Sequence, residues 1–281
     1  MAKVNFLSNK ELLHEIHLSK KSYCYFVDDA FAAYDVIVRD ITEVTEELIN
    51  EARAKRAANQ VQQAKLVLKN QGLKAHQIKV DAVELTEIPV DSIIIRLMTD
   101  KHIPLLPEED LKPSQKLEDE CRLKVNFPPF KHFKLTYDGD NHAESVDTTK
   151  LSFVEVGRSH WKGGFDNGSF CMDHGNITDR LARMYMKLVD RYSQKPNWRG
   201  YSYLEEMKSQ SLLQLIQVGL KFDESRSQNP FAYYTTTMTN SFTGVFHKEK
   251  RNQNIRDDIL IMQGHNPSNT RMVEHELAEK K

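Results

Sequence analysis

Residues that could catalyse a reaction or hold a metal ion are few in this 281-residue sequence. It contains no glycine-rich phosphate loop, no nucleophile elbow and no HExxH motif, so no enzymatic reaction is indicated. Cys171 and His174 have the spacing of two metal ligands, but they lack a second pair, and a loop cysteine beside a solvated histidine is favoured instead. Adjacent acids such as Glu205 and Glu206 diverge by about 100° on a helix and cannot form one acid–base site. We therefore expect no catalytic residue, no cofactor and no bound metal.

A second group of residues suits contact with nucleic acid. The segment 229–256 combines aromatic, hydroxyl, amide and cationic side chains, and its apolar residues repeat at helical spacing. Aromatic rings stack on unpaired bases for about 1–3 kcal/mol each, while polar and cationic groups hold base edges and phosphates. The alternative is that the aromatic residues fill a core. The candidate DNA-binding residues are Tyr233, Tyr234, Thr237, Asn240, Ser241, His247, Lys248 and Arg251.

Three helices with short connections are expected to position these residues. Asn176 is the expected N-cap of the first helix, which continues to Tyr192. The second spans about 203–220, and Asn229 followed by Pro230 begins the third. The predicted buried residues of the second and third helices are Leu204, Met207, Leu212, Leu215 and Ile216, then Phe231, Tyr234, Met238, Phe242 and Val245.

The first 168 residues have a mixed pattern. A capping box, Ser8 with Glu11, begins a short helix, and a second helix is predicted over 40–70. Apolar runs or alternation predict strands at Ile93–Leu97 and, after residue 121, around Leu123–Phe127, Phe133–Tyr137 and Phe153–Val156. Within the basic, aromatic stretch 121–168, the candidate contacts to DNA or polymerase are Arg122, Lys131, Arg158 and Trp161. The alternative is a β subdomain whose aromatic residues form a core.

Charge and composition narrow the class of protein. Residues 177–256 contain 13 Lys and Arg against 7 Asp and Glu, so this segment is the candidate for contact with a polyanion. That excess of 6 is modest for unaided DNA binding, so another component is expected to deliver the DNA. Three distant cysteines predict neither a disulfide framework nor a zinc site. Without an apolar run of about 20 residues or a signal peptide, the expected compartment is the cytoplasm.

Several motifs resemble the second conserved region of bacterial sigma factors. The resemblance lies in Lys221–Glu224 (KFDE), Asn229–Tyr234 (NPFAYY) and Lys248–Arg251 (KEKR). It is closer to the late-transcription sigma factors of T-even-like phages, particularly the cyanophage subgroup. The segments that carry this closer likeness are Asn9–Leu13, Val125–Phe130, Gly157–Trp161, Asn197–Tyr201 and Gln253–Arg256.

The resemblance implies a role for two of the helices. The helix before the Lys-Phe motif would dock on the clamp coiled coil of the largest polymerase subunit, and the following helix would capture unpaired bases of the nontemplate strand. Tyr234 falls on the family's base-stacking tyrosine. The implied polymerase-binding residues are Glu205, Glu206, Ser209 and Gln210.

The sequence also departs from the family. Where primary sigma factors carry a tandem tryptophan wedge this chain has Thr237 and Met238, and Ser241 and Gly244 replace the duplex-reading Gln and Thr. Base specificity therefore cannot be transferred. The tail Arg271–Lys281 does not match the clamp-binding tail of the T-even relatives, so dependence on the sliding clamp is not expected.

Together these observations predict a mainly α protein. We expect a three-helix domain like sigma region 2 with a small α+β insertion containing short antiparallel strands. The expected function is a phage sigma factor that binds host core RNA polymerase and melts late promoters at a -10-like element, in the cytoplasm of the infected cell. The alternative is a polymerase-binding regulator, of the anti-sigma or inhibitor type, that does not read DNA. The expected segments are 1–22 (N-terminal helix), 23–120 (acidic insertion and linker), 121–168 (β-containing), 169–260 (helical domain) and 261–281 (polar tail).

Overall fold

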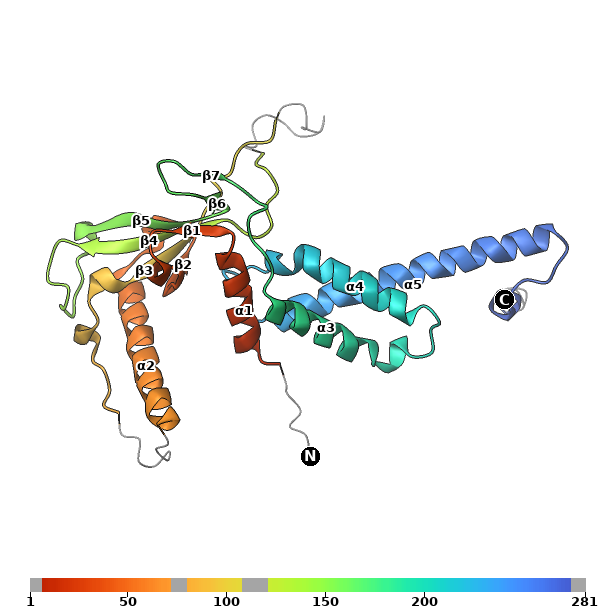
Figure 1. Cartoon of the computed structure of the whole chain (residues 1–281), viewed down its shortest axis with the longest axis horizontal. Helices are drawn as coiled ribbons and strands as arrows, with labels where there is room; N and C mark the ends of the chain where they lie inside the picture. The colour runs from red at the N-terminus through yellow and green to blue at the C-terminus, as the bar shows by residue number, and fades with distance from the viewer. Residues whose placement is uncertain (1–6, 72–79, 108–120, 274–281) are drawn as a thin grey trace. The chain divides into compact units, whose positions relative to one another are not determined.

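The computed structural model describes residues 7–71, 80–107 and 121–273, which divide into two compact units (Figure 1). Of the described residues, the helical unit comprises 7–13, 179–219 and 229–273. The sheet unit comprises the described residues 14–71, 80–107, 121–178 and 220–228. Helix α1, Asn9–Lys21, contributes its first residues to the helical unit and the rest to the sheet unit.

Three helices form the body of the helical unit. They are α3 (Asp179–Ser193), α4 (Leu204–Val218) and α5 (Pro230–Met262), and α4 packs against both others. The predicted cap of α5 is confirmed, because the Asn229 side chain accepts a hydrogen bond from the Ala232 N–H at 3.3 Å. The predicted cap of α3 is wrong: the helix begins at Asp179, and the Asn176 N–H donates to the Ser22 hydroxyl instead.

The core of the helical unit follows the periodicity of its helices. Residues spaced by three or four are buried on each helix, as the side-chain geometry of an α-helix requires. From α3 these are Leu181, Met184, Tyr185, Leu188 and Val189; from α4, Met207, Ser211 and Leu215; from α5, Tyr234, Met238, Phe242 and Val245. Of the predicted core residues, Leu204, Leu212 and Phe231 are only partly buried, and Ile216 has half of its surface exposed.

Within the described residues, the sheet unit contains a five-stranded mixed sheet in the order β1-β5-β4-β3-β2. The strands are β1 (Cys24–Phe26), β2 (Val36–Val38), β3 (Ile94–Met98), β4 (Phe130–Tyr137) and β5 (Leu151–Ser159). Neighbours pair antiparallel except β2 and β3, which are parallel. A short ribbon of β6 (Trp161–Lys162) and β7 (Ser169–Phe170) follows.

Helix α2, Glu46–Asn70, lies on one face of the sheet (Figure 1). Thr45 caps it, and its Ile49 and Ala52 join a buried apolar cluster with Val38, Ile95 and Leu135. Short 3₁₀ turns complete the chain path at Asp29–Ala32 (η1), Ile41–Glu43 (η2), Leu85–Glu87 (η4), Val90–Ser92 (η5), Thr148–Lys150 (η7), Pro196–Trp198 (η8) and Gly219–Lys221 (η9).

The prediction of a mainly α fold with a small α+β insertion is wrong. The sheet and α2 have their own buried core, which is too large for an insertion in a three-helix domain. The physical reason is long-range pairing, because β2 and β3 from the acidic segment join β4 and β5 from the basic, aromatic segment. The strands expected at Ile93–Leu97, Phe133–Tyr137 and Phe153–Val156 are confirmed, but no strand forms at Leu123–Phe127.

Candidate nucleic-acid and polymerase interface

Helix α5 presents one continuous polar face to solvent. Residues spaced by three or four along the helix lie on the side opposite its buried stripe. All of them are exposed, and together they define the exposed face of α5: Thr236, Asn240, Gly244, His247, Lys248 and Arg251. A Cβ added at Gly244 would meet nothing within 4 Å, so the backbone there is open to a ligand. Four of the predicted DNA-binding residues, Asn240, His247, Lys248 and Arg251, thus share one surface.

The other predicted DNA-binding residues of α5 point away from this face or bond within the helix. Tyr234 is fully buried. Tyr233 is half-buried and donates its hydroxyl to the Val218 carbonyl at 2.8 Å. The Thr237 hydroxyl donates to the Tyr233 carbonyl, and the Ser241 hydroxyl is buried without a hydrogen-bond partner among the described residues. Burial therefore removes Tyr234 from the candidate surface.

Tyr234 stabilises the helical core through a pair of tyrosine hydroxyls. Its hydroxyl lies 3.1 Å from that of Tyr185 and donates to the Gly219 carbonyl at 3.2 Å. The two rings meet edge to face at 5.1 Å, and burial raises the pKa of Tyr185. A Cβ on Gly219 would collide with the Tyr185 hydroxyl at 2.3 Å, so only glycine fits at this position.

We expect Tyr234→Phe to lower the free energy of unfolding by about 1–2 kcal/mol, because the Gly219 carbonyl and the Tyr185 hydroxyl lose a partner. Urea denaturation followed by circular dichroism measures the change. Tyr201→Phe is the matched control, since the Tyr201 side chain is exposed. A Tyr234→Phe variant of unchanged stability would show that the hydroxyl pair contributes nothing to the core.

Helix α4 exposes the residues predicted to bind polymerase. Glu205, Glu206, Ser209 and Gln210 are all exposed. Leu213 and Ile216, spaced three residues apart, continue the same side of the helix with 51% and 50% of their surface exposed. These six residues define the exposed face of α4, which is acidic at its start and apolar at its end. Sequence periodicity missed the apolar part because Ile216 has the spacing of a core residue.

The predicted contacts of the sheet unit all have partners inside the unit. Lys131 and Arg158 both pair with Glu155, at 2.9 and 2.7 Å. The Arg158 guanidinium lies over the Trp161 ring at 4.3 Å. Arg122 donates to the Ile103 carbonyl at 2.7 Å. The neighbouring Phe127 and Phe130 are buried, so these two aromatic residues of the segment form core, and the four side chains are held in place by internal contacts.

Neither a metal site nor a membrane-spanning helix is found in the parts of the chain that the structure describes. No group of three or more His, Cys, Asp or Glu side chains there is placed to hold a metal ion. Within residues 7–71, 80–107 and 121–273, no helix combines the length and apolar composition that a bilayer crossing requires. The described cysteines, Cys24, Cys121 and Cys171, are free thiols.

A buried charge cluster in the sheet unit is absent from the sequence predictions. The Lys20 ammonium, which is 1% exposed, donates to the Phe222 carbonyl at 2.7 Å and to the Glu224 carboxylate at 2.8 Å. Arg96, which is 3% exposed, lies 3.9 Å from the same carboxylate. Burial alone would raise the pKa of Glu224, but the charges of Lys20 and Arg96 and a hydrogen bond from His17 hold it well below its usual range.

His132 fixes the orientation of Arg96 within this cluster. Burial and the charge of Arg96 lower the pKa of His132 to about 3, so its imidazole is neutral. Its Nδ1 donates to the Phe31 carbonyl at 2.7 Å, which leaves Nε2 to accept the Nε–H of Arg96 at 2.9 Å. The guanidinium is sandwiched between the rings of Tyr34 and Phe130, at 3.8 and 3.9 Å from their centres.

Comparisons with known proteins identified no relative of the chain. No protein family, no curated protein and no solved structure matches the chain.

Proposed function

We propose that this chain is a sigma-type initiation factor of a phage, which binds host core RNA polymerase and opens late promoters in the infected cell. The proposal rests on the sequence motifs and, above all, on the exposed face of α5. That face combines an amide, an imidazole and two cations with an open glycine backbone. Amide and cationic side chains contact base edges and phosphates, so such a face is suited to binding nucleic acid.

The exposed face of α4 supports the polymerase part of the proposal. Its acidic residues suit an arginine-rich coiled coil, since opposite charges set orientation and speed encounter. Leu213 and Ile216 supply apolar surface that a partner would bury. Helix α4 packs directly on α5 within one compact unit, so a protein bound to the first would hold DNA near the second.

A triple variant, Asn240→Ala with Lys248→Ala and Arg251→Ala, tests the role of α5. We expect open-complex formation on late-gene DNA, followed by permanganate reactivity, to fall about tenfold or more while polymerase binding is retained. The salt dependence of DNA binding should also weaken. The slope of the logarithm of the binding constant against the logarithm of the salt concentration should fall by about 1 for each phosphate that the variant no longer neutralises. Arg256→Ala is the matched control, because Arg256 is an exposed cation on another side of α5. Unchanged promoter opening by the triple variant would refute the DNA-binding role.

Measuring the binding of a double variant, Leu213→Ala with Ile216→Ala, to core polymerase tests the role of α4. Truncating these two apolar side chains is expected to weaken polymerase binding about tenfold or more. Met186→Ala is the control, since Met186 is a similarly exposed apolar residue on α3. Equal polymerase binding by both variants would remove α4 from the interface.

A polymerase-binding regulator that does not read DNA is the second candidate. The burial of Tyr234 favours it, because the tyrosine of the sigma motif is then not available to stack on a base. If the α4 variant loses polymerase binding while wild type never opens a promoter with core enzyme, the regulator is supported instead.

A further inference from the structure

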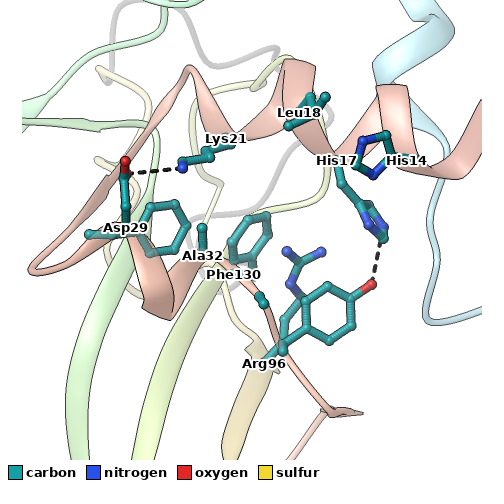
Figure 2. Close-up of a pocket in the computed structure, with 11 residues that line it drawn as sticks. His14, His17, Leu18, Lys21, Asp29, Ala32, Arg96 and Phe130 are labelled. Carbon is teal, nitrogen blue, oxygen red and sulfur yellow. Dashed lines mark hydrogen bonds and ion pairs between the residues drawn. The ribbon is translucent and has the colours of Figure 1, made fainter. Parts of the chain in front are cut away.

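A cavity of about 470 Å³ lies in the sheet unit between α1, η1 and the sheet (Figure 2). Its walls include the aromatic rings of Phe26, Tyr34 and Phe130, and Arg96 contributes a charged group to its lining. A volume of this size, with mostly apolar walls and a few polar groups, is typical of a site for a small molecule. The cavity belongs entirely to the sheet unit and is independent of the function proposed for the helical unit.

The charges beside the cavity do not balance. Lys20 and Arg96 are both buried, and they share the single carboxylate of Glu224. His17 and His132 add no further positive charge, because burial lowers the pKa of each. At the rim, Lys21 and Asp29 neutralise each other at 2.9 Å, and His14 is exposed. Lys20 is also attracted by the partly exposed carboxylate of Asp223, so among the described residues Arg96 is the buried cation without a close carboxylate of its own. Buried charges are rarely unpaired in proteins.

The guanidinium of Arg96 carries this excess charge at the cavity. Donation from Nε to His132 is the one hydrogen bond it makes to described residues, and its buried Nη1 has no hydrogen-bond partner among them. Figure 2 shows its terminal nitrogens directed from the sheet toward Leu18 and His17 of α1. The flanking rings hold the guanidinium plane fixed, so its terminal N–H groups are preorganised for an acceptor.

We propose that this cavity binds a small organic acid, in which a carboxylate or phosphate group is attached to an apolar body. The acid group accepts hydrogen bonds from the terminal nitrogens of Arg96, as guanidinium groups bind planar oxyanions. The apolar body lies against Phe26 and Phe130 and excludes water from the ion pair. The bound acid supplies the negative charge that Glu224 alone does not provide.

Calorimetric titration of the full chain with four probes tests the chemistry. Benzoate and phenyl phosphate have both parts of the proposed ligand, whereas inorganic phosphate lacks the apolar body and benzyl alcohol lacks the charge. We expect saturable binding of at least one of the two aromatic acids, at least about tenfold tighter than either incomplete probe. Comparing benzoate with phenyl phosphate distinguishes carboxylate from phosphate ligands. Two outcomes would overturn the proposal. One is that inorganic phosphate binds as tightly as the aromatic acids. The other is that neither aromatic acid saturates the protein up to about 10 mM, the weakest affinity such a site would give.

A matched pair of variants locates the binding. Ala33 lines the cavity and Ala30 does not, and both are exposed alanines at the same turn. Ala33→Trp should fill the cavity and raise the dissociation constant of the better acid about tenfold or more, whereas Ala30→Trp should not change it. In the folded wild-type protein, the Nε–H resonance of Arg96 should shift with the same dissociation constant. Equal affinity of the two variants, or an unmoved Arg96 resonance, would place the acid elsewhere and overturn the assignment.

Discussion

Replacing Glu224 with glutamine is expected to lower the free energy of unfolding by about 3–5 kcal/mol, the usual effect of breaking a buried ion pair. Glutamine keeps the size of the side chain but removes the charge that Lys20 and Arg96 share. Both cations would then stay buried without their closest counter-charge. Urea denaturation at pH 7 measures the loss. Glu205→Gln is the control, because the Glu205 side chain is 82% exposed and should change stability by no more than about 0.5 kcal/mol.

The same residue predicts a direction for acid unfolding. The pKa of Glu224 is lowered in the folded protein, so the unfolded chain takes up the proton more readily. The stability contributed by Glu224 is therefore fully present above the unfolded pKa of about 4.3 and is lost as the pH falls toward the folded value. We expect the stabilities of wild type and Glu224→Gln to converge as the pH falls. A constant difference between them from pH 7 to about pH 3 would contradict the assigned ion pair.

Arg53→Ala is expected to destabilise the sheet unit by about 3–4 kcal/mol. Arg53 on α2 is fully buried, and its guanidinium donates to the carbonyls of Ile88 and Ala143, both at 2.8 Å. These bonds tie α2 to two loops far away in the sequence. Alanine leaves both carbonyls unsatisfied and opens a cavity where the side chain was.

Lys55→Ala on the same helix is the control for Arg53→Ala, since Lys55 is exposed and pairs with Glu51 one turn earlier. Its effect should be about 0.5 kcal/mol or less. Thermal or urea unfolding of both variants gives the comparison. If both variants lose the same small amount, the two carbonyl bonds do not anchor the helix.

Surface faces were predicted well where a local pattern decides them. The polar side of α5 follows from helical spacing, and the structure exposes Asn240, His247, Lys248 and Arg251 on that side. Spacing alone cannot tell which side of an aromatic-rich helix is buried by its neighbours. Tyr234 was therefore predicted both as a core residue and as a candidate DNA-binding residue. Its contacts with Tyr185 and Gly219 in the structure place it in the core.

The buried charge cluster could not be predicted from the sequence. Lys20 lies in an ordinary helical segment, and Glu224 lies 204 residues further along the chain. Nothing near either residue in the sequence indicates burial, because a long charged side chain is normally solvated. The cavity beside Arg96 depends on the same long-range contacts.

The sequence alone determined the local elements of this protein. The capping box of Ser8 and Glu11, the cap at Asn229 and the helical spacing of apolar residues in α3 and α5 depend on residues a few positions apart. Only the tertiary structure decided the sheet. Strand β1 pairs with β5, with Cys24 opposite Ser159, and β2 pairs with β3, with Val36 opposite Ile95. Strands β1 and β2 have only three residues each. Strands so short have too little periodicity to identify a partner, and chain folding over long distances brought them together.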